Sequence, residues 1–268
     1  MSSTRPTRLT VEEYRQFVQE HFPRKNSALY ELDSGIFTPT FLQAIDAGTP
    51  EGLRGIFREE LPEVYSFEML RSDFCEQLIE EADWFNEWCV ENELHKNVPN
   101  TMNNYGAVLD DFGFQPMLQE FMVRYISPLA RSLYPDVGGA TLNDHHGFLV
   151  DYEMGKDESL DFHVDASEVT LNVCLGKEFV GGALYFGGVR CMVCQQTAPL
   201  ASEEVEVNHS PGMGLLHRGK HRHAARPITR GRRCNLIMWC MSQEYQRGYD
   251  SNKCQPWCGY RVVRESNR

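Results

Sequence analysis

The spacing of apolar residues changes near Gly139, and this change divides the chain into a helical part and a strand-rich part. From Phe67 to Trp88 apolar residues recur every three or four positions, which predicts an amphipathic helix. A second helical pattern covers Leu118 to Leu133, and Pro128 within it should kink or split the helix. Beyond Gly139, short segments rich in β-branched, leucine and aromatic residues alternate with turn residues, which predicts strands. These strand candidates are His146–Tyr152, Val169–Leu175, Gly181–Gly187, Gly212–His217 and Cys234–Cys240.

Helices followed by many short strands are typical of an α+β protein. We therefore expect a β-sandwich or jelly roll packed by the N-terminal helices. Residues 1–65, whose short helical patterns are broken by glycine- and proline-containing stretches, are expected to form an N-terminal helical extension. Residues 66–245 are expected to form the main domain, and residues 246–268 a cysteine-containing C-terminal tail.

Length, composition and charge narrow the class of protein. A chain of 268 residues with 41% hydrophobic residues can bury a sizeable core. The net charge of −12 disfavours non-specific binding to nucleic acid or to an anionic membrane. The N-terminal sequence lacks the apolar stretch of a signal peptide, and no run of about 18 apolar residues predicts a membrane span. These features favour an intracellular protein, cytoplasmic or nuclear.

The nine cysteines are odd in number and scattered, which favours free thiols. Two pairs stand out, Cys191 with Cys194 and Cys254 with Cys258. Together they could form one zinc site, although the spacing of the second pair is loose. The alternative is that they are ordinary buried or surface thiols.

The main candidate for chemistry is a set of metal ligands. His163 and Asp165 are two residues apart, so on an extended segment their side chains share one face. Such a pair is common by chance and is weak evidence alone. About 60 residues later His223 supplies a third candidate ligand, ahead of a turn marked by Pro227 and Gly231. Two histidines and one carboxylate leave coordination positions open, which is the arrangement of non-haem Fe(II) oxygenases.

Arg233 lies at the start of the strand that follows this turn. A 2-oxoglutarate molecule that chelates iron needs a planar, permanently charged partner for its distal carboxylate, and arginine is such a partner. By strand alternation Arg233 shares a face with Asn235 and Ile237, whereas Arg232 points away. The alternative is that Arg233 is a surface residue in a basic run.

The sequence resembles the Fe(II)- and 2-oxoglutarate-dependent dioxygenases of the prolyl 4-hydroxylase and procollagen lysyl hydroxylase type. The family pattern is H-x-D followed by H-x-x-x-P-x-x-x-G-x-R/K, and it is matched by His163, Asp165, His223, Pro227, Gly231 and Arg233. His217 is a competitor for the third ligand, but the proline, glycine and arginine fall at the family spacing only from His223. The resemblance begins at about Tyr65 and continues to the end of the chain.

This resemblance implies a double-stranded β-helix with the metal at its open end. It implies Fe(II), 2-oxoglutarate and O2, with L-ascorbate keeping the iron reduced, and hydroxylation of a C–H bond with release of succinate and CO2. A protein or peptide side chain, lysyl or prolyl, is the implied substrate. Tyr152 matches the family tyrosine that hydrogen-bonds the cosubstrate. Asn172, with Thr170 and Cys174 on the same strand face, is expected to point into the pocket.

Three alternatives stay open at this point. The segment from Arg218 to Arg233 holds seven Lys or Arg in sixteen residues, and such a patch could contact an acidic substrate or nucleic acid, as in an oxidative demethylase. A non-catalytic jelly-roll module is another possibility, and a zinc hydrolase with the same ligands is disfavoured. Residues 99–106 and 191–207 are candidate substrate-contacting segments at the pocket.

Overall fold

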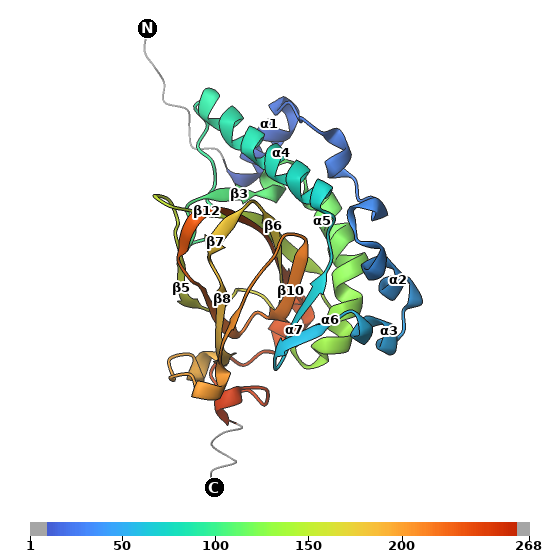
Figure 1. The fold of residues 1–268 in the computed structure, drawn as a ribbon, viewed down its shortest axis with the longest axis vertical. Helices are drawn as coiled ribbons and strands as arrows, with labels where there is room; N and C mark the ends of the chain where they lie inside the picture. The colour runs from blue at the N-terminus through green and yellow to red at the C-terminus, as the bar shows by residue number, and fades with distance from the viewer. Residues whose placement is uncertain (1–9, 262–268) are drawn as a thin grey trace.

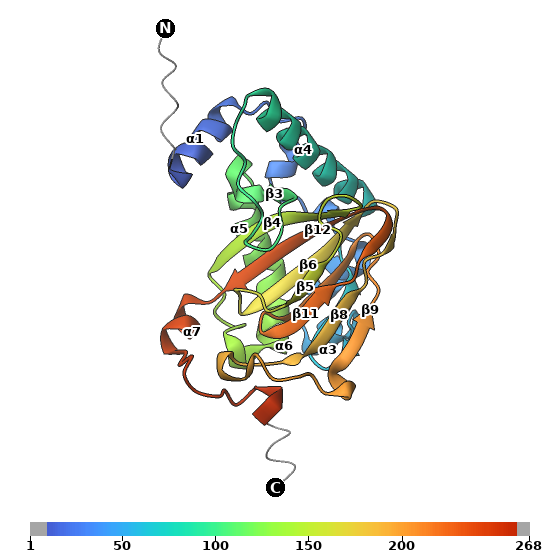
Figure 2. The ribbon, with the colours of Figure 1, turned by 90° about the vertical axis from the view of Figure 1, so that its left-hand side faces the viewer.

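The structure is a computed structural model that describes residues 10–261, and its centre is a barrel of two antiparallel sheets. One sheet has eight strands, in the order β1-β2-β10-β6-β12-β4-β3 with β7 paired to β12. The other has four strands, in the order β5-β11-β8-β9. Figure 1 shows the barrel with the helices along one side, and Figure 2 shows the four strands of the smaller sheet lying side by side. This is the expected jelly roll packed by helices.

The elements follow one another as helices, a first strand pair, helices again, and then a continuous series of strands. The α-helices are α1 (Val11–His21), α2 (Pro39–Ala47), α3 (Pro50–Gly55), α4 (Ser72–Glu91), α5 (Gln115–Phe121), α6 (Ser127–Leu133) and α7 (Gln243–Gly248). The strands are β1 (Arg58–Leu61), β2 (Val64–Glu68), β3 (Gly106–Val108), β4 (Asp144–Glu153), β5 (Leu160–His163), β6 (Val169–Gly176), β7 (Phe179–Gly181), β8 (Leu184–Val189), β9 (Glu204–Val207), β10 (Met213–Arg218), β11 (His221–Ala225) and β12 (Ile228–Met241).

The larger sheet separates two apolar cores, and strand β6 shows how. All eight of its residues are buried, because helices cover one face and the smaller sheet covers the other. Leu171 and Val173 belong to the core between the sheet and the helices. Thr170 and Asn172, with the opposite parity, line the cavity inside the barrel. Successive side chains of a strand point to opposite faces, so β6 places apolar groups under the helices and polar groups in the interior.

Helix α4 packs against β6 and β3 on the outside of the barrel. It confirms the predicted helix from Ser72 onward, whereas Phe67, at the start of the prediction, belongs to β2. The residue preceding the helix is Arg71, which makes no side-chain cap and whose guanidinium pairs with the Asp73 carboxylate. Arg232 of β12 connects the sheet to this helix, because it pairs with Asp83 of α4 and with Asp151 of β4. In the described part of the chain, no helix has both the length and the apolar character of a membrane span.

Pro128 splits the second predicted helix, as expected. Helix α5 runs into a π-helical turn, Met122–Ile126, and α6 begins at Ser127. Proline has no N–H to donate to the preceding turn, so it is tolerated in the first turn of the new helix.

The first 65 residues contain more than the expected helices. Strand β1 and the start of β2 fall within them, and β2 pairs with β10 in the larger sheet. Val18 and Phe41 are fully buried in the same core as the sheet residues. The expected boundary at residue 65 therefore lies inside β2, and the division into domains stays a prediction.

Candidate active site

Two neighbouring strands of the smaller sheet hold the two histidines of the predicted motif. His163 ends β5, and His223 lies in the middle of β11. The antiparallel register places the two residues directly opposite each other, and their ring centroids are 4.3 Å apart. Directly opposite residues on one face of such a pair have their Cβ atoms about 5 Å apart, so the register alone brings the imidazoles together.

Asp165 lies just beyond the end of β5 and is fixed by three hydrogen bonds. The Asp165 backbone N–H donates to the Gly219 carbonyl at 2.9 Å, and Lys220 Nζ donates to the Asp165 carbonyl at 2.7 Å. The Thr170 hydroxyl donates to Asp165 Oδ2 at 2.6 Å. Asp165 is only 3% exposed. The carboxylate is thus held in one orientation by backbone and side-chain contacts together.

The three side chains converge on one point. His163 Nε2 lies 3.6 Å from Asp165 Oδ1, and His223 Nε2 lies 3.8 Å from Asp165 Oδ2. One ligand atom from each residue lies within 4.8 Å of the other two. The other ring nitrogens face backbone carbonyls, His163 Nδ1 with Asp161 at 2.7 Å and His223 Nδ1 with His221 at 2.9 Å. A carbonyl only accepts, so each Nδ1 carries the proton and each Nε2 offers its lone pair to the centre.

The charge states of these residues suit a divalent metal ion. Burial disfavours the Asp165 carboxylate, but the imidazoles of His223 and His163 hold its pKa below the usual range. Burial lowers the pKa of His223 to about 3, so this imidazole is neutral at physiological pH. Burial also acts on His163, but the Asp165 carboxylate outweighs it and raises the pKa of His163. A deprotonated carboxylate and imidazole lone pairs are what a metal ion binds, and the set fits the 2-His-1-carboxylate arrangement.

One cavity inside the barrel contains all six predicted site residues. They are Tyr152, His163, Asp165, Asn172, His223 and Arg233. Apolar side chains, among them Phe148, Val150, Leu184 and Ile237, form most of the remaining wall. Apart from Ile237, which shares a strand face with Arg233, the sequence did not single out these wall residues, because an inward-facing apolar residue in a strand looks the same whether it packs a core or lines a cavity.

Arg233 is a buried cation that has no acidic partner within the described part of the chain. It is 1% exposed, and it lies opposite Tyr152 in the β12–β4 pair, with its guanidinium 5.1 Å from the Tyr152 ring centroid. Nε donates to Asn235 Oδ1 at 3.0 Å, and Nη1 donates to the Gly182 carbonyl. Among residues 10–261 no carboxylate forms an ion pair with it, and burial lowers its pKa. Such a charge calls for an anionic ligand in the cavity.

Behind Arg233 lies a chain of polar groups that sequence reasoning only partly found. Asn235 Nδ2 donates to Asn172 Oδ1 at 2.6 Å and approaches His209 Nδ1 at 3.3 Å. His209 Nε2 faces the Met213 carbonyl at 2.8 Å, so Nε2 carries the proton. Burial, helped by Arg233, lowers the pKa of His209 to about 3. The one available signal for Asn235 was its shared parity with Arg233.

Other expectations about the site have mixed outcomes. Thr170 and Asn172 line the cavity, but Cys174 does not. His217, the competing ligand, is buried with Nδ1 on the Arg218 carbonyl, outside the converging group. Of the two candidate substrate-contacting segments, residues 99–106 reach the cavity through Asn100, Met102 and Asn103. Residues 191–207 do not line it, because residues 191–203 lie beyond the end of β8 and β9 is the edge strand of the smaller sheet.

The basic run between Arg218 and Arg233 is largely occupied by internal contacts. Arg218 pairs with Glu63 and Asp136, and Arg232 pairs with Asp83 and Asp151. Arg226 pairs with Glu206. Cations that are already paired offer less to a phosphate backbone, so this observation does not favour the nucleic-acid alternative.

Comparisons with known proteins agree with this geometry. A family model described as an OGFOD2-like domain matches residues 18–139. The chain is 45% identical over 249 residues to the 2-oxoglutarate and iron-dependent oxygenase domain-containing protein CP2 of Arabidopsis thaliana, which covers 92% of this chain. The present chain covers 63% of that relative, which is less than two thirds of the relative's length.

Two further relatives broaden the comparison. The 2-oxoglutarate and iron-dependent oxygenase domain-containing protein 2 of Danio rerio is 37% identical over 261 residues, covering 95% of this chain and 72% of the relative. Human procollagen-lysine,2-oxoglutarate 5-dioxygenase 1 is 29% identical over 180 residues, covering 64% of this chain and 23% of the relative. The second match is with a fraction of a much longer protein.

Proposed function

The chain belongs to the family of 2-oxoglutarate and iron-dependent oxygenase domain-containing protein 2, and from this premise we propose that it is a 2-oxoglutarate-dependent dioxygenase that hydroxylates a C–H bond. The observation that carries the proposal is the cavity that holds both Arg233, a buried cation without an acidic partner among the described residues, and the His163–Asp165–His223 group. A metal site and an anion site in one cavity suit a dicarboxylate that chelates a metal.

His163 and His223 would hold Fe(II) through their Nε2 atoms, and Asp165 through its carboxylate. The bound iron supplies the redox chemistry by which O2 and 2-oxoglutarate are consumed together. The protein keeps the ligands in place through the Thr170 hydroxyl and the backbone carbonyls that fix both imidazoles. Such outer contacts orient ligands and raise their affinity for metal.

Arg233 would bind the distal carboxylate of 2-oxoglutarate, and two neighbours would assist. Burial raises the pKa of Tyr152, so its hydroxyl stays protonated and can donate to the same carboxylate. Asn172 is held by Asn235, and its amide faces the cavity. Apolar walls such as Phe148 and Ile237 exclude water, and a low local dielectric strengthens the contact between the guanidinium and the carboxylate.

In the proposed reaction one oxygen atom of O2 enters the substrate C–H bond as a hydroxyl group. The other enters succinate, which forms from 2-oxoglutarate with loss of CO2, and L-ascorbate keeps the iron reduced. We propose a protein or peptide side chain as substrate, of the lysyl or prolyl type. Support comes from the likeness to a procollagen-lysine dioxygenase and from the polar residues Asn100 and Asn103 at the cavity. All nine cysteines are free, which is consistent with an intracellular location.

The direct test measures both products. The protein is incubated in air with Fe(II), 2-oxoglutarate, ascorbate and a digested proteome, and succinate and oxygen-gaining peptides are quantified by mass spectrometry. We expect succinate and a set of hydroxylated peptides from the wild type and neither from Asp165→Ala. Arg226→Ala, which removes an exposed arginine paired with Glu206, is the matched control and should behave as wild type. Equal succinate from wild type and Asp165→Ala would contradict the proposal.

A further inference from the structure

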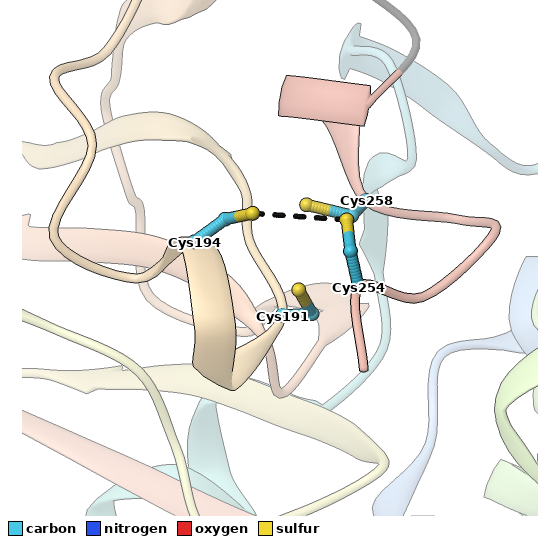
Figure 3. A group of neighbouring side chains, drawn as sticks. All are labelled: Cys191, Cys194, Cys254 and Cys258. Carbon is cyan, nitrogen blue, oxygen red and sulfur yellow. Dashed lines mark hydrogen bonds between the residues drawn. The ribbon is translucent and has the colours of Figure 1, made fainter. Parts of the chain in front are cut away.

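Four cysteines outside the cavity form a second cluster, and we propose that they bind one structural zinc ion. Cys191 and Cys194 follow β8, whereas Cys254 and Cys258 belong to the C-terminal segment after α7. Figure 3 shows the four sulfur atoms turned toward a common centre, with the two segments facing each other across it. Sixty residues separate Cys194 from Cys254, so the convergence is a product of the fold.

The spacing of the sulfur atoms suits a tetrahedral ion. Each sulfur lies within 4.8 Å of the other three, and Cys194 Sγ lies 3.7 Å from Cys254 Sγ. A zinc ion with four Zn–S bonds of about 2.3 Å has sulfur atoms about 3.8 Å apart. A disulfide would require a separation of about 2.05 Å. The cluster is therefore sized for one metal ion rather than for a pair of disulfides.

Local backbone structure prepares the ligands. Cys191 and Cys194 flank a short 3-10 turn in which the Cys194 N–H donates to the Cys191 carbonyl at 3.0 Å. The Cys258 N–H likewise donates to the Gln255 carbonyl at 3.1 Å, which folds the second pair into a turn. The two turns give the paired spacing of structural zinc sites.

Burial indicates a closed site. Cys191 and Cys258 are fully buried, Cys194 nearly so, and Cys254 is half-buried. Catalytic zinc sites keep a position open to water, whereas structural sites use four protein ligands. Four thiolates with one zinc ion carry a net charge of −2, so nearby cations are expected.

Two buried arginines supply this positive charge. Arg190 is 1% exposed and pairs with Glu203, and its guanidinium lies 5.9 Å from the Tyr260 ring centroid. Arg222 is 4% exposed and donates only to backbone carbonyls, including those of Gln195 and Thr197 just after the first cysteine pair. In the described chain Arg222 has no ion pair, so a dianionic cluster would supply its missing counter-charge.

The C-terminal segment has a small apolar cluster of its own. Within residues 10–261 this cluster consists of the four cysteines with the partly buried Trp257 and Tyr260, and Trp257 also packs against the main core. Trp257 Nε1 donates to the Tyr245 hydroxyl at 3.1 Å. Short segments with so little core commonly depend on a metal or a disulfide for their fold. Zinc would thus attach this segment to the loop after β8.

Metal analysis of the intact chain tests the proposal. Protein purified without chelator is measured for zinc by mass spectrometry, and the proposal predicts about one zinc per chain. Asp165→Ala, which disables the other metal group, should retain that zinc, whereas Cys191→Ser and Cys258→Ser should lose it. Cys89→Ser is the matched control, because Cys89 is buried in α4 outside the cluster and faces the Tyr14 hydroxyl.

A second measurement keeps the test decisive if the serine variants do not fold. A mercurial reagent titrated into the wild type should release zinc in proportion to thiol modification, and cobalt(II) substitution should give the visible spectrum of a tetrahedral tetrathiolate. Wild-type protein without zinc would overturn the proposal. So would zinc that persists when Cys191→Ser is combined with Asp165→Ala, which disables the other metal group, or disulfides in place of free thiols in the freshly purified chain.

Discussion

The two clusters of metal-ligand side chains differ in how the chain builds them. The His163–Asp165–His223 group lies on paired strands, and the register of β5 with β11 sets its geometry. The cysteine group lies on two irregular segments that no strand pairing joins. The first group opens into a cavity and would offer a metal ion three protein ligands, whereas the second is largely enclosed and would offer four. Strand pairing thus sets the geometry of the proposed iron site, whereas the proposed zinc ion would itself join two loops.

The largest effect should come from the charge that makes the first site specific for a dicarboxylate. Arg233→Ala leaves the cavity without its cation, so 2-oxoglutarate binding measured by calorimetry without O2 should weaken about 100-fold or more. Zinc content should not change. Arg226→Ala, an exposed arginine, should bind 2-oxoglutarate as wild type does. Unchanged affinity in Arg233→Ala would remove the anchor assignment and with it the contrast between the two sites.

An intermediate effect should follow when an outer contact of the first group is lost. Thr170→Val keeps the side-chain shape but removes the hydroxyl that donates to Asp165 Oδ2. Iron affinity, measured by titration under anaerobic conditions, should fall about 10- to 100-fold. Thr229→Val, whose hydroxyl bonds the Val180 carbonyl outside the cavity, should change it little. A result equal to wild type would mean that backbone contacts alone orient the carboxylate.

The smallest effect on iron should come from the residue that connects the two regions. Arg222 precedes His223 and donates to carbonyls of the loop after the first cysteine pair. Arg222→Met should lower the free energy of unfolding in urea by about 1–3 kcal/mol. Iron affinity should change by about twofold at most, as expected for independent sites. A loss as large as that in Thr170→Val would show that the two clusters are coupled.

The ligand motif was predictable because its information is local. His163 and Asp165 are two residues apart, and His223 is tied to Arg233 by a fixed spacing along the chain. The antiparallel register of β5 with β11, in which His163 lies opposite His223, then brings the two local motifs together. The cysteine cluster could be named as a candidate but not decided, because nothing in the sequence states that the C-terminal segment returns to β8.

The strands that hold the ligands were harder to predict than the ligands. The sequence pattern indicated β4, β6, β8, β10 and β12, whose apolar residues alternate or run together. Strand β11 reads HRHAA, and its buried histidines look polar in any pattern of hydrophobicity. Strand β1 was missed because its sequence, REEL, is short and charged. Strand β2 was missed because it is short and gains stability from pairing with β10, a partner about 150 residues away.

The pairing of His163 with His223 sets what the loop before β5 can tolerate. A strand that shifts by one residue against its partner presents the opposite set of side chains. The length of the turn between β4 and β5, residues 154–159, therefore matters for the register of β5 against β11. Inserting or deleting a single residue there should turn His163 away from Asp165 and His223 and leave a folded protein without its chemistry.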